Sequence, residues 1–317
     1  MIYLPDFKEK SVLFIKAGDF NESKIKFSND NIVFLKDEKV ENRVSCHKIF
    51  VVFIIGELSI TSVLVRKCLQ YGVSLFLLGR DFKLYGSFGA KAEGNYLLRM
   101  KQYNFNKEFL FAKQIVKNKV FNQLRLLRKK RIIEKAKYQN LKAEVFSKID
   151  LAKDNQELLG IEGSQQKNFY GLYFKELGWY RRVPRAKVDE YNLLLDIGYT
   201  FLFNYCDSLL RLYGFDTYKG FYHKLFFQRR SLSCDIMEPF RCVIDRQLLK
   251  SFKLNQINKK DFKVANGAYV LNFQESQKYA EIFLGAISEY KEEIFKFTHG
   301  FYRAVLTGSD KLPVFKV

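Results

Sequence analysis

The 317-residue sequence predicts an α+β protein, with a small N-terminal β-rich domain at residues 1–92 and a larger, mostly α-helical domain at residues 93–317. Two observations support this division. Short runs of β-branched and aromatic residues fill the first part of the chain, whereas apolar residues recur at helical spacing in the rest. Apolar residues also make up 48% of the chain, which suffices for a buried core and excludes a disordered protein.

The N-terminal region is predicted to form four strands, then a helix and a hairpin. The strands are indicated by runs that lie between Gly, Asn, Asp and Ser residues: SVLFIK, SKIKF, NIVFLK and KIFVVFII. One helix is predicted at residues 60–72, ending at Gly72, from an apolar pattern at helical spacing: Ile60, Val63, Leu64 and Cys68. The segments VSLFLL and FKLYGSF, joined by the short loop GRD, predict a β-hairpin.

Residues 97–148 combine a long helical pattern with concentrated positive charge. The apolar side chains step by threes and fours along one helix face: Phe109, Ala112, Val116, Val120, Leu124 and Leu127. This segment holds fifteen Lys and Arg residues against three Glu, a net +12 of the chain's +20. Because solvated faces normally mix both signs, the segment favours phosphate binding. Its densest group of candidate phosphate contacts is Arg128, Lys129, Lys130 and Arg131.

The rest of the chain is predicted to be mainly helical. Helices are expected within residues 156–212, 235–250 and 274–306. Between the last two ranges, FKVA and AYVL flank Asn266-Gly267, which is the strongest short signal for a hairpin in the chain.

Composition limits the classes of partner and compartment. A formal charge of +20 implies a polyanionic partner, such as nucleic acid, an anionic membrane or an acidic protein. The longest apolar run, KIFVVFIIG, has the length of a strand, so no membrane span is expected. The N-terminal MIYLPDFKEK lacks the pattern of a signal peptide, which predicts a cytoplasmic protein. Five cysteines without a CxxC motif predict reduced thiols.

One short stretch concentrates groups that carry chemistry. In GFYHKLFFQRRSLSCDIMEPFR, His223 precedes Asp235 and Glu238. A further acid, Glu162, lies between two glycines in an otherwise apolar stretch, where a nucleic-acid strand or another helix would come close to the backbone. An imidazole with two carboxylates suits Mg²⁺ or Mn²⁺. No GxSxG motif and no GxxxxGK[ST] phosphate loop is present.

The same residues also allow structural interpretations. A histidine in the aromatic run GFYHKLFF is often a hydrogen-bonded core residue. Asp235 and Glu238 have the spacing of a helix capping box, and Pro239 is compatible with a first helical turn. Spacing alone leaves the cap and the metal site equally open.

Three stretches together resemble the CRISPR-associated integrase family, the DNA-cutting and strand-joining subunit of bacterial spacer acquisition. They are LLGIEGSQQKNFYGLYF, RAKVDEYNLLLDIGYTFLF and GFYHKLFFQRRSLSCDIMEPFR. The upstream ITSVLVRKCLQYGVSLFLLG is similar to the family's β domain, so the resemblance covers nearly the whole chain. Its closest similarity is to the branch that accompanies type V effector systems.

The resemblance implies a set of site residues. Glu162, His223 and Glu238 would hold the Mg²⁺ or Mn²⁺ ion and form the catalytic site. Asp235 would be an auxiliary acid, and Asn192 would lie close to the site. Further phosphate contacts are expected from five arginines: Arg181, Arg182, Arg185, Arg229 and Arg230.

The resemblance also implies an activity and an assembly. The protein would join the 3′-hydroxyl of a short DNA fragment to the CRISPR repeat by transesterification. It would act as a homodimer formed through its N-terminal domain, bridged by a small ferredoxin-like subunit and bound to double-stranded DNA. Two alternatives stay open, a metal-dependent nuclease that cuts branched DNA without integration and a non-catalytic DNA-binding scaffold.

Overall fold

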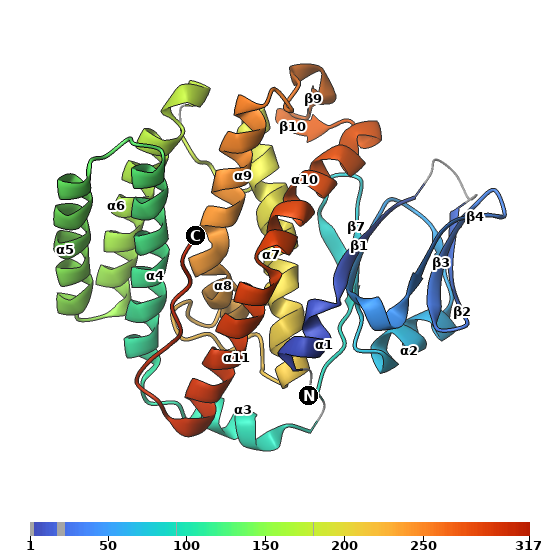
Figure 1. Ribbon diagram of the computed structural model, residues 1–317, viewed down its shortest axis with the longest axis horizontal. Coiled ribbons are helices and arrows are strands. Elements are labelled where there is room, and N and C mark those ends of the chain that lie inside the picture. Colours follow the sequence, from blue (N-terminus) through green and yellow to red (C-terminus); the bar gives the residue numbers. More distant parts are fainter. Residues whose placement is uncertain (1–2, 18–22, 93, 180) are drawn as a thin grey trace.

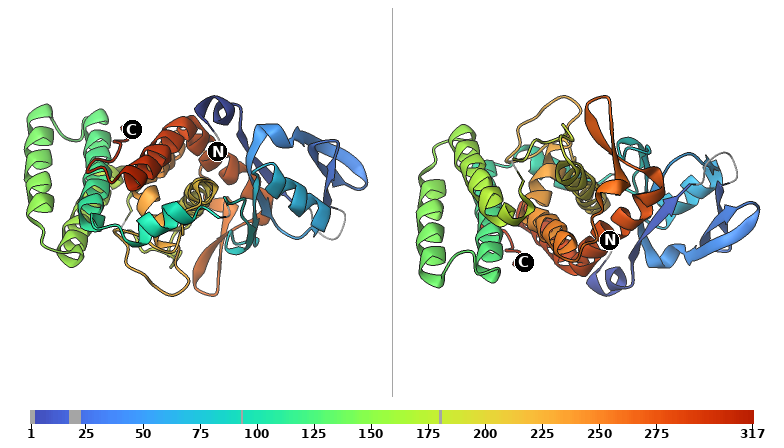
Figure 2. Two further views of the ribbon diagram at one scale, coloured as in Figure 1. Left: turned by 90° about the horizontal axis from the view of Figure 1, so that it is seen from below. Right: turned by 90° about the horizontal axis from the view of Figure 1, so that it is seen from above.

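The computed structural model describes residues 3–17, 23–92, 94–179 and 181–317 (Figure 1). The strands β1–β8 and the helix α2 form one end of the molecule, and the helices α4, α5 and α6 form the opposite end. The remaining long helices lie between these ends, as Figure 2 shows from two further directions. The predicted α+β class, with a β-rich N-terminal part and a mainly helical C-terminal part, is confirmed.

The first sheet has four strands in the order β1-β5-β7-β8. They are β1 (Ser11–Lys16), β5 (Ile49–Ile55), β7 (Ser74–Leu78) and β8 (Leu84–Phe88). The strands β1, β5 and β7 run parallel, and β8 pairs with β7 as the predicted hairpin. All seven residues of β5 are buried because both faces of the sheet are covered. Val51 and Phe53 pack into the core shared with the helices, whereas Val52 and Ile54 pack into the smaller core below the second sheet.

The second sheet and one helix complete the N-terminal region. Their elements are β2 (Ser23–Ser28), β3 (Asn31–Lys36), β4 (Lys39–Ser45), β6 (Ser59–Ile60) and α2 (Ser62–Gln70), with the sheet ordered β4-β3-β2-β6. Leu64 and Cys68 are buried as the predicted helix requires, but Val63 is 47% exposed. The sequence KVENRVS of β4 escaped prediction because it is largely polar and its first five residues are exposed.

The helical part contains nine longer helices among the described residues. These are α3 (Tyr96–Tyr103), α4 (Glu108–Lys129), α5 (Lys135–Leu151), α6 (Asn155–Tyr173), α7 (Glu190–Tyr213), α8 (Ser231–Met237), α9 (Arg241–Lys253), α10 (Ser276–Glu289) and α11 (Lys291–Thr307), preceded in the chain by the short α1 (Leu4–Lys8). Within the part of the chain that the structure describes, no helix has both the length and the apolar character of a membrane span.

The helix α7 forms the centre of the helical part and contacts α8, α9, α10 and α11. Its Gly198 allows this close packing, because a Cβ there would lie only 2.5 Å from Ile244 Cγ2 and 2.9 Å from Phe283 Cδ1. Phe201 of α7 also packs against Phe53 of β5, with ring centroids 4.9 Å apart. One hydrophobic cluster therefore joins both predicted domains. Residue 93, where the second domain is predicted to begin, lies outside the described residues, and that boundary stays a prediction.

Two local predictions can be compared directly with the structure. The apolar stripe on residues 109–127 is buried along α4, except that Phe109 is only partly buried. The basic segment 97–148 does not form one long helix but spans α3, α4 and α5. The break between α4 and α5 follows Lys129, where α4 ends and Arg131 takes a left-handed φ of 57°. The hairpin of β9 (Phe262–Ala265) and β10 (Ala268–Leu271) turns at Asn266 and Gly267, with φ of 51° and 74°. A two-residue turn with positive φ at both positions is what this Asn-Gly pair favours.

Candidate active site

Three elements bring two carboxylates to one ammonium group. Glu162 comes from α6, Lys119 from α4, and Glu238 from the short 3-10 turn between α8 and α9. The Nζ atom of Lys119 lies 2.7 Å from Oε2 of Glu238 and forms an ion pair with Oε1 of Glu162. Lys119 is only 5% exposed and Glu238 only 3%. The structure therefore brings two of the predicted ligands together, and it adds a lysine that sequence reasoning missed.

Glu238 is held ionised inside the protein. Its Oε1 accepts a 2.9 Å hydrogen bond from Nε of Arg241. Burial alone would raise the pKa of Glu238, but the charges of Arg241, Lys119 and His223 outweigh burial and hold the pKa at about 2. Despite its ion pair with Lys119, the buried Oε2 has no hydrogen bond of good geometry. This carboxylate oxygen thus has one cationic contact, Lys119, and no hydrogen bond that ties it to another donor.

Asp235 fixes the loop that carries His223. Its fully buried carboxylate accepts hydrogen bonds from the backbone N–H groups of Phe221, Tyr222 and His223, at 2.6, 3.0 and 2.9 Å. The same carboxylate lies 2.7 Å from Nδ1 of His223. When Nδ1 donates to Asp235, Nε2 of the partly exposed ring keeps the lone pair that a metal ligand needs. This geometry matches a histidine that is oriented by a carboxylate.

The structure excludes the capping-box interpretation. The helix α8 begins at Ser231, four residues before Asp235, so the predicted helix start at residue 235 is wrong. Asp235 bonds to the preceding loop, and the Glu238 carboxylate pairs with Lys119 and Arg241 rather than with a helix N-terminus. The local spacing was compatible with a cap, but the long-range partners decide the orientation of both side chains.

Glycines shape the site on two sides. At Gly220, a Cβ would lie 2.9 Å from Oδ2 of Asp235 and 2.7 Å from the carbonyl oxygen of His223, so only glycine lets the loop close on the carboxylate. At Gly160 and Gly163, which flank Glu162, a Cβ would meet nothing within 4 Å. Of the two explanations for these glycines, close packing by another helix is wrong, and the backbone beside Glu162 is open.

Glu162, Glu238 and His223 are suitable ligands for a divalent cation, but the Lys119 side chain lies between the two glutamates. Two carboxylates and an imidazole are ligands that Mg²⁺ or Mn²⁺ accepts, and the under-used Oε2 of Glu238 supports the fit. No group of three acidic, histidine or cysteine side chains within the described ranges is arranged as a metal site. Glu162 and Glu238 instead meet at the Lys119 ammonium.

Most of the chain matches one known protein family. Residues 20–284 match the family described as CRISPR associated protein Cas1. The chain belongs to the Cas1 family. Among its relatives, CRISPR-associated endonuclease Cas1 1 of Thermodesulfovibrio yellowstonii is 28% identical over 266 residues, which cover 80% of this chain and 83% of that protein. The predicted family is therefore confirmed.

Solved structures share the fold at low sequence identity. A casposase bound to integration product has a TM-score of 0.81 at 18% identity, covering 96% of this chain and 94% of that one. A Cas1 protein from Thermotoga maritima also has a TM-score of 0.81, at 20% identity, with 93% and 97% covered. A chain of a Cas6-RT-Cas1–Cas2 complex has a TM-score of 0.78 at 22% identity, with 97% of this chain and 36% of that chain covered.

Several predicted polar residues of this Cas1 chain serve internal contacts. The amide of the buried Asn192 receives hydrogen bonds from Arg182 and the N–H of Val183, and it donates to the carbonyl of Arg181 and to Asp189. It thus fastens residues 181–183 to the start of α7, and the structure shows no contact with the three predicted ligands. A role of Asn192 at the site stays a prediction.

The predicted arginines divide into two groups. Arg182 pairs with Asp196, and Arg230 lies 2.6 Å from Asp207; their side chains are 11% and 13% exposed. Both arginines thus have internal partners, and their role as phosphate contacts stays a prediction. Arg229 donates to Ser231 Oγ at 3.2 Å and to the carbonyl of Lys224, which holds a loop. Arg181 and Arg185 are exposed and stay candidates for phosphate contact.

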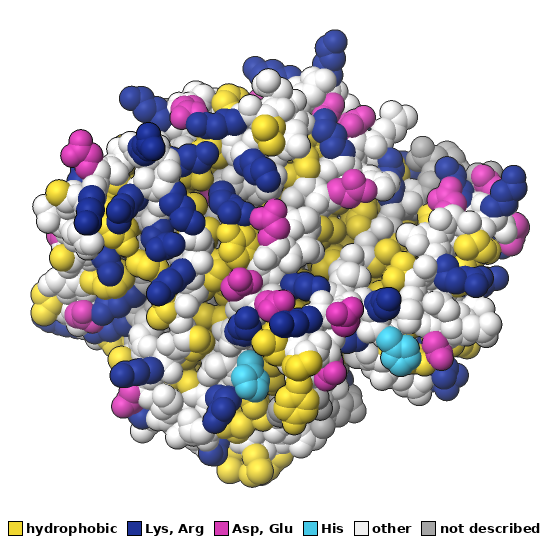
Figure 3. Space-filling view, in the orientation of Figure 1, with side chains coloured by type: hydrophobic (Ala, Val, Ile, Leu, Met, Phe, Trp, Pro, Cys, Tyr) yellow, Lys and Arg dark blue, Asp and Glu magenta, His cyan; other side chains and the backbone are white. Residues whose placement is uncertain are grey.

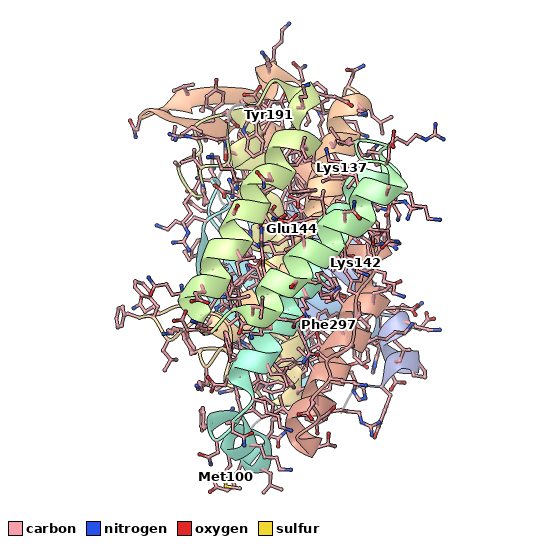
Figure 4. The ribbon with its side chains drawn as sticks, turned by 90° about the vertical axis from the view of Figure 1, so that its left-hand side faces the viewer. Met100, Lys137, Lys142, Glu144, Tyr191 and Phe297 are labelled. Atoms are coloured by element: carbon pink, nitrogen blue, oxygen red, sulfur yellow. The ribbon has the colours of Figure 1, made fainter. Side chains whose placement is uncertain are left out.

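Basic side chains gather over the α4–α6 end of this Cas1 fold, as the space-filling view shows (Figure 3). Viewed from that end, α5 and α6 lie side by side, with Lys137 and Lys142 on α5 (Figure 4). The predicted group at the end of α4 is exposed: Arg128, Lys129, Lys130 and Arg131. Lys129 nevertheless donates a 2.8 Å hydrogen bond to the carbonyl of Val317. The segment charge of +12 is thus not all on the surface, since Lys119 is inside.

A buried polar network connects α6, which carries Glu162, with α7 and α9. The hydroxyl of Tyr170 on α6 lies 2.8 Å from that of Tyr199 on α7, and Tyr199 donates a 2.5 Å hydrogen bond to Asp245 on α9. Burial raises the pKa of Asp245 to about 6, although the Tyr199 hydrogen bond and the charge of Arg241 act in the opposite direction.

We expect the Asp245→Asn variant to be more stable than the wild type at neutral pH by about 2 kcal/mol, because no ionised carboxylate is then buried. The folded chain keeps this proton up to pH about 6, whereas an unfolded aspartate releases it near pH about 4. The wild-type free energy of unfolding should therefore fall as pH rises through this interval, and the variant should lack this fall. Denaturant unfolding across the interval measures both; parallel curves for the two proteins would contradict the assignment.

Proposed function

We propose that this chain is a metal-dependent DNA endonuclease and integrase of CRISPR adaptation. The observation that carries the proposal is the meeting of Glu162 and Glu238 at one cationic point, near an imidazole held by Asp235, within a Cas1 fold. Relatives described as CRISPR-associated endonucleases and the fold shared with a casposase bound to integration product support this class of reaction. The branch that accompanies type V effectors stays a prediction from the resemblance.

The residues of the site would have two roles, as metal ligands and as groups that orient those ligands. Glu162, Glu238 and Nε2 of His223 would hold Mg²⁺ or Mn²⁺, which when bound neutralises phosphate oxygens and lowers the pKa of an attacking hydroxyl. Asp235 orients His223, and Arg241 orients Glu238. The open backbone at Gly160 and Gly163 leaves room for a DNA strand beside Glu162.

Partners follow from the family and from its solved assemblies. Cas1 is found with Cas2 in a Cas6-RT-Cas1–Cas2 complex. We infer the same kind of assembly here, namely a homodimer formed through the N-terminal region, the small ferredoxin-like adaptation subunit and double-stranded DNA. Exposed basic residues around α4 and α5 would hold the phosphate backbone without reading bases.

A strand-transfer assay tests the function. Purified protein and its small partner are incubated with a labelled DNA fragment and a plasmid that carries the repeat, with Mg²⁺, with Mn²⁺ or with excess chelator. The proposal expects labelled joint molecules with metal and none with chelator. Cleavage of branched DNA without joining would favour the structure-specific nuclease. DNA binding without metal binding, cleavage or joining would favour the scaffold.

The basic group at the end of α4 should contribute measurably to DNA affinity. We expect the double variant Lys130→Gln, Arg131→Asn to flatten the plot of log K against log salt concentration by about 0.9 for each phosphate that the protein no longer neutralises. Asparagine suits the positive φ of Arg131, and neither change removes the Lys129 bond to Val317. The matched control changes two exposed lysines of the β-rich region, Lys26→Gln and Lys39→Gln. Equal slopes for both double variants would show that this face does not contact DNA.

A further inference from the structure

We infer that Lys119 is the internal counter-ion of Glu162 and Glu238 in the metal-free protein and competes with a divalent cation for these carboxylates. This inference rests on the proposed function, since it concerns the same site. Its basis is a lysine placed inside the protein by α4, with Nζ in ion-pair contact with both acids.

The Lys119 ammonium is buried, so it needs counter-ions inside the protein. The Lys119 side chain is 6% exposed, and both Val116, one turn earlier on α4, and the adjacent Val120 belong to the hydrophobic core. An ammonium without a partner is strongly disfavoured in such a place, as are two adjacent carboxylates without a cation. The three side chains therefore stabilise one another while no metal is present.

A divalent cation cannot share this arrangement. Nζ contacts one oxygen of each carboxylate, so a cation that bound both of these oxygens would lie close to the ammonium, and like charges repel at short range. The Lys119 ammonium must then move away from these oxygens, which its flexible four-carbon stem permits. The contact between α4 and α6 need not open, because Gln123 and Gln166 form a separate hydrogen bond of 3.2 Å between these helices. Metal affinity is therefore lower than the same ligands would give without the lysine.

The test measures Mn²⁺ binding by calorimetry on the full chain without DNA. In Lys119→Met the affinity for Mn²⁺ should rise at least about tenfold, because no ammonium has to be displaced. The melting temperature without metal should fall, since the two carboxylates lose their counter-ion. Lys119→Gln keeps a hydrogen-bond donor and should also raise the affinity for Mn²⁺ and lower the melting temperature. It replaces the methionine variant if that variant does not fold. Lys117→Met on the same helix is the matched control, because Lys117 pairs with Asp150 instead.

The outcomes separate this inference from the proposed function. If the wild type binds Mn²⁺ and both Lys119 variants bind it equally or more weakly, competition is wrong and the lysine assists the site. If a variant binds Mn²⁺ where the wild type shows no binding, the inference is supported. If none of these proteins binds Mn²⁺, the proposed metal site is wrong, and the inferred competition by Lys119 is wrong as well.

A second, independent observation concerns the loop directly after His223. Leu225, Phe226 and Phe227 are 68%, 69% and 82% exposed, and Phe227 is the most exposed large hydrophobic side chain of the described residues. The loop is closed at its base, because the Lys224 carbonyl accepts hydrogen bonds from Arg229 and from Oγ of Ser231. It therefore presents its apolar tip to solvent from an anchored position.

The geometry points to a stacking contact in which Phe226 and Phe227 receive an unpaired base of the DNA bound at the site. Proteins bind single-stranded nucleic acid through aromatic side chains, on which bases stack, and through nearby cationic side chains. Here Arg229 lies 5.5 Å from the centre of the Phe226 ring. The loop also continues directly from His223, so bound DNA would pass it. This inference again rests on the proposed function.

The test is a DNA-binding titration in chelator, which does not require catalysis. The probe is a duplex with a short unpaired end that carries 2-aminopurine, compared with a fully paired duplex. The double variant Phe226→Ala, Phe227→Ala should bind the unpaired end about tenfold more weakly, with loss of fluorescence quenching, and should bind the paired duplex as before. Tyr96→Ala is the matched control, since Tyr96 is an aromatic side chain of similar exposure, 69%, on α3.

Two results would overturn the stacking contact. One is equal loss of affinity for both DNAs, or no loss at all, while the wild type binds DNA normally. The other is unchanged DNA binding together with a smaller mass in sedimentation, which would make the loop an interface between proteins. Absence of DNA binding by the wild type would instead refute the proposed function.

Discussion

Glu238→Gln is expected to lower strand transfer by more than about 100-fold, beyond what loss of an outer-shell partner of a metal ligand usually costs. Glutamine keeps the size of the side chain but removes the charge that would hold a divalent cation. It also leaves Lys119 and Arg241 beside a neutral, buried amide. Because one partner of a buried ionic cluster is lost, the free energy of unfolding without metal should fall by about 3 kcal/mol.

Activity, Mn²⁺ binding and denaturant unfolding of the same preparations check this prediction. Glu289→Gln is the matched control, because Glu289 is paired with Arg246 at 2.7 Å but is half exposed, so its loss should cost under about 1 kcal/mol. Wild-type strand transfer by Glu238→Gln would falsify the ligand role. Full stability together with lost activity would show that the ion pairs with Lys119 and Arg241 contribute nothing to folding.

Asp235→Asn should lower both the stability and the strand-transfer activity, with the second largest effect that we expect from a single substitution. The native carboxylate accepts three backbone N–H groups and the imidazole of His223, whereas an amide has one acceptor oxygen and a donor that faces other donors. Buried donors are then left without partners, and the free energy of unfolding should fall by about 3 kcal/mol. In the protein that stays folded, strand transfer should fall about 10- to 100-fold, since His223 is no longer oriented.

Asp261→Asn is the control that separates stability from orientation. Asp261 is also largely buried and accepts 2.7 Å hydrogen bonds from Lys278 and Tyr279, but it lies by the β9–β10 hairpin. We expect this variant to lose stability while keeping activity below its melting temperature. If both variants lost activity in proportion to stability alone, Asp235 would be a structural residue and not a positioning one.

The sequence was informative wherever a few neighbouring residues decide the structure. The β-branched and aromatic run KIFVVFII predicted a strand, Asn266-Gly267 predicted a tight hairpin, and the stripe along α4 predicted a buried helix face. The candidate site residues came from the resemblance, in which residue types and spacing are preserved across distant stretches. The capping interpretation failed because Asp235 and Glu238 have cap spacing without cap partners.

By itself, the sequence determined the fold class, most helices and strands, the basic segment and the residues to consider as ligands. Only the tertiary structure decided that Lys119 meets Glu162, 43 residues away, that Arg182 and Arg230 are used internally, and that β1, β5 and β7 pair in parallel. The physical reason is the distance along the chain over which each kind of interaction acts. Backbone preferences and periodicity act over a few residues, whereas the partner of a buried charge is set by how whole helices pack, and a buried ion takes whichever counter-ion that packing brings to it.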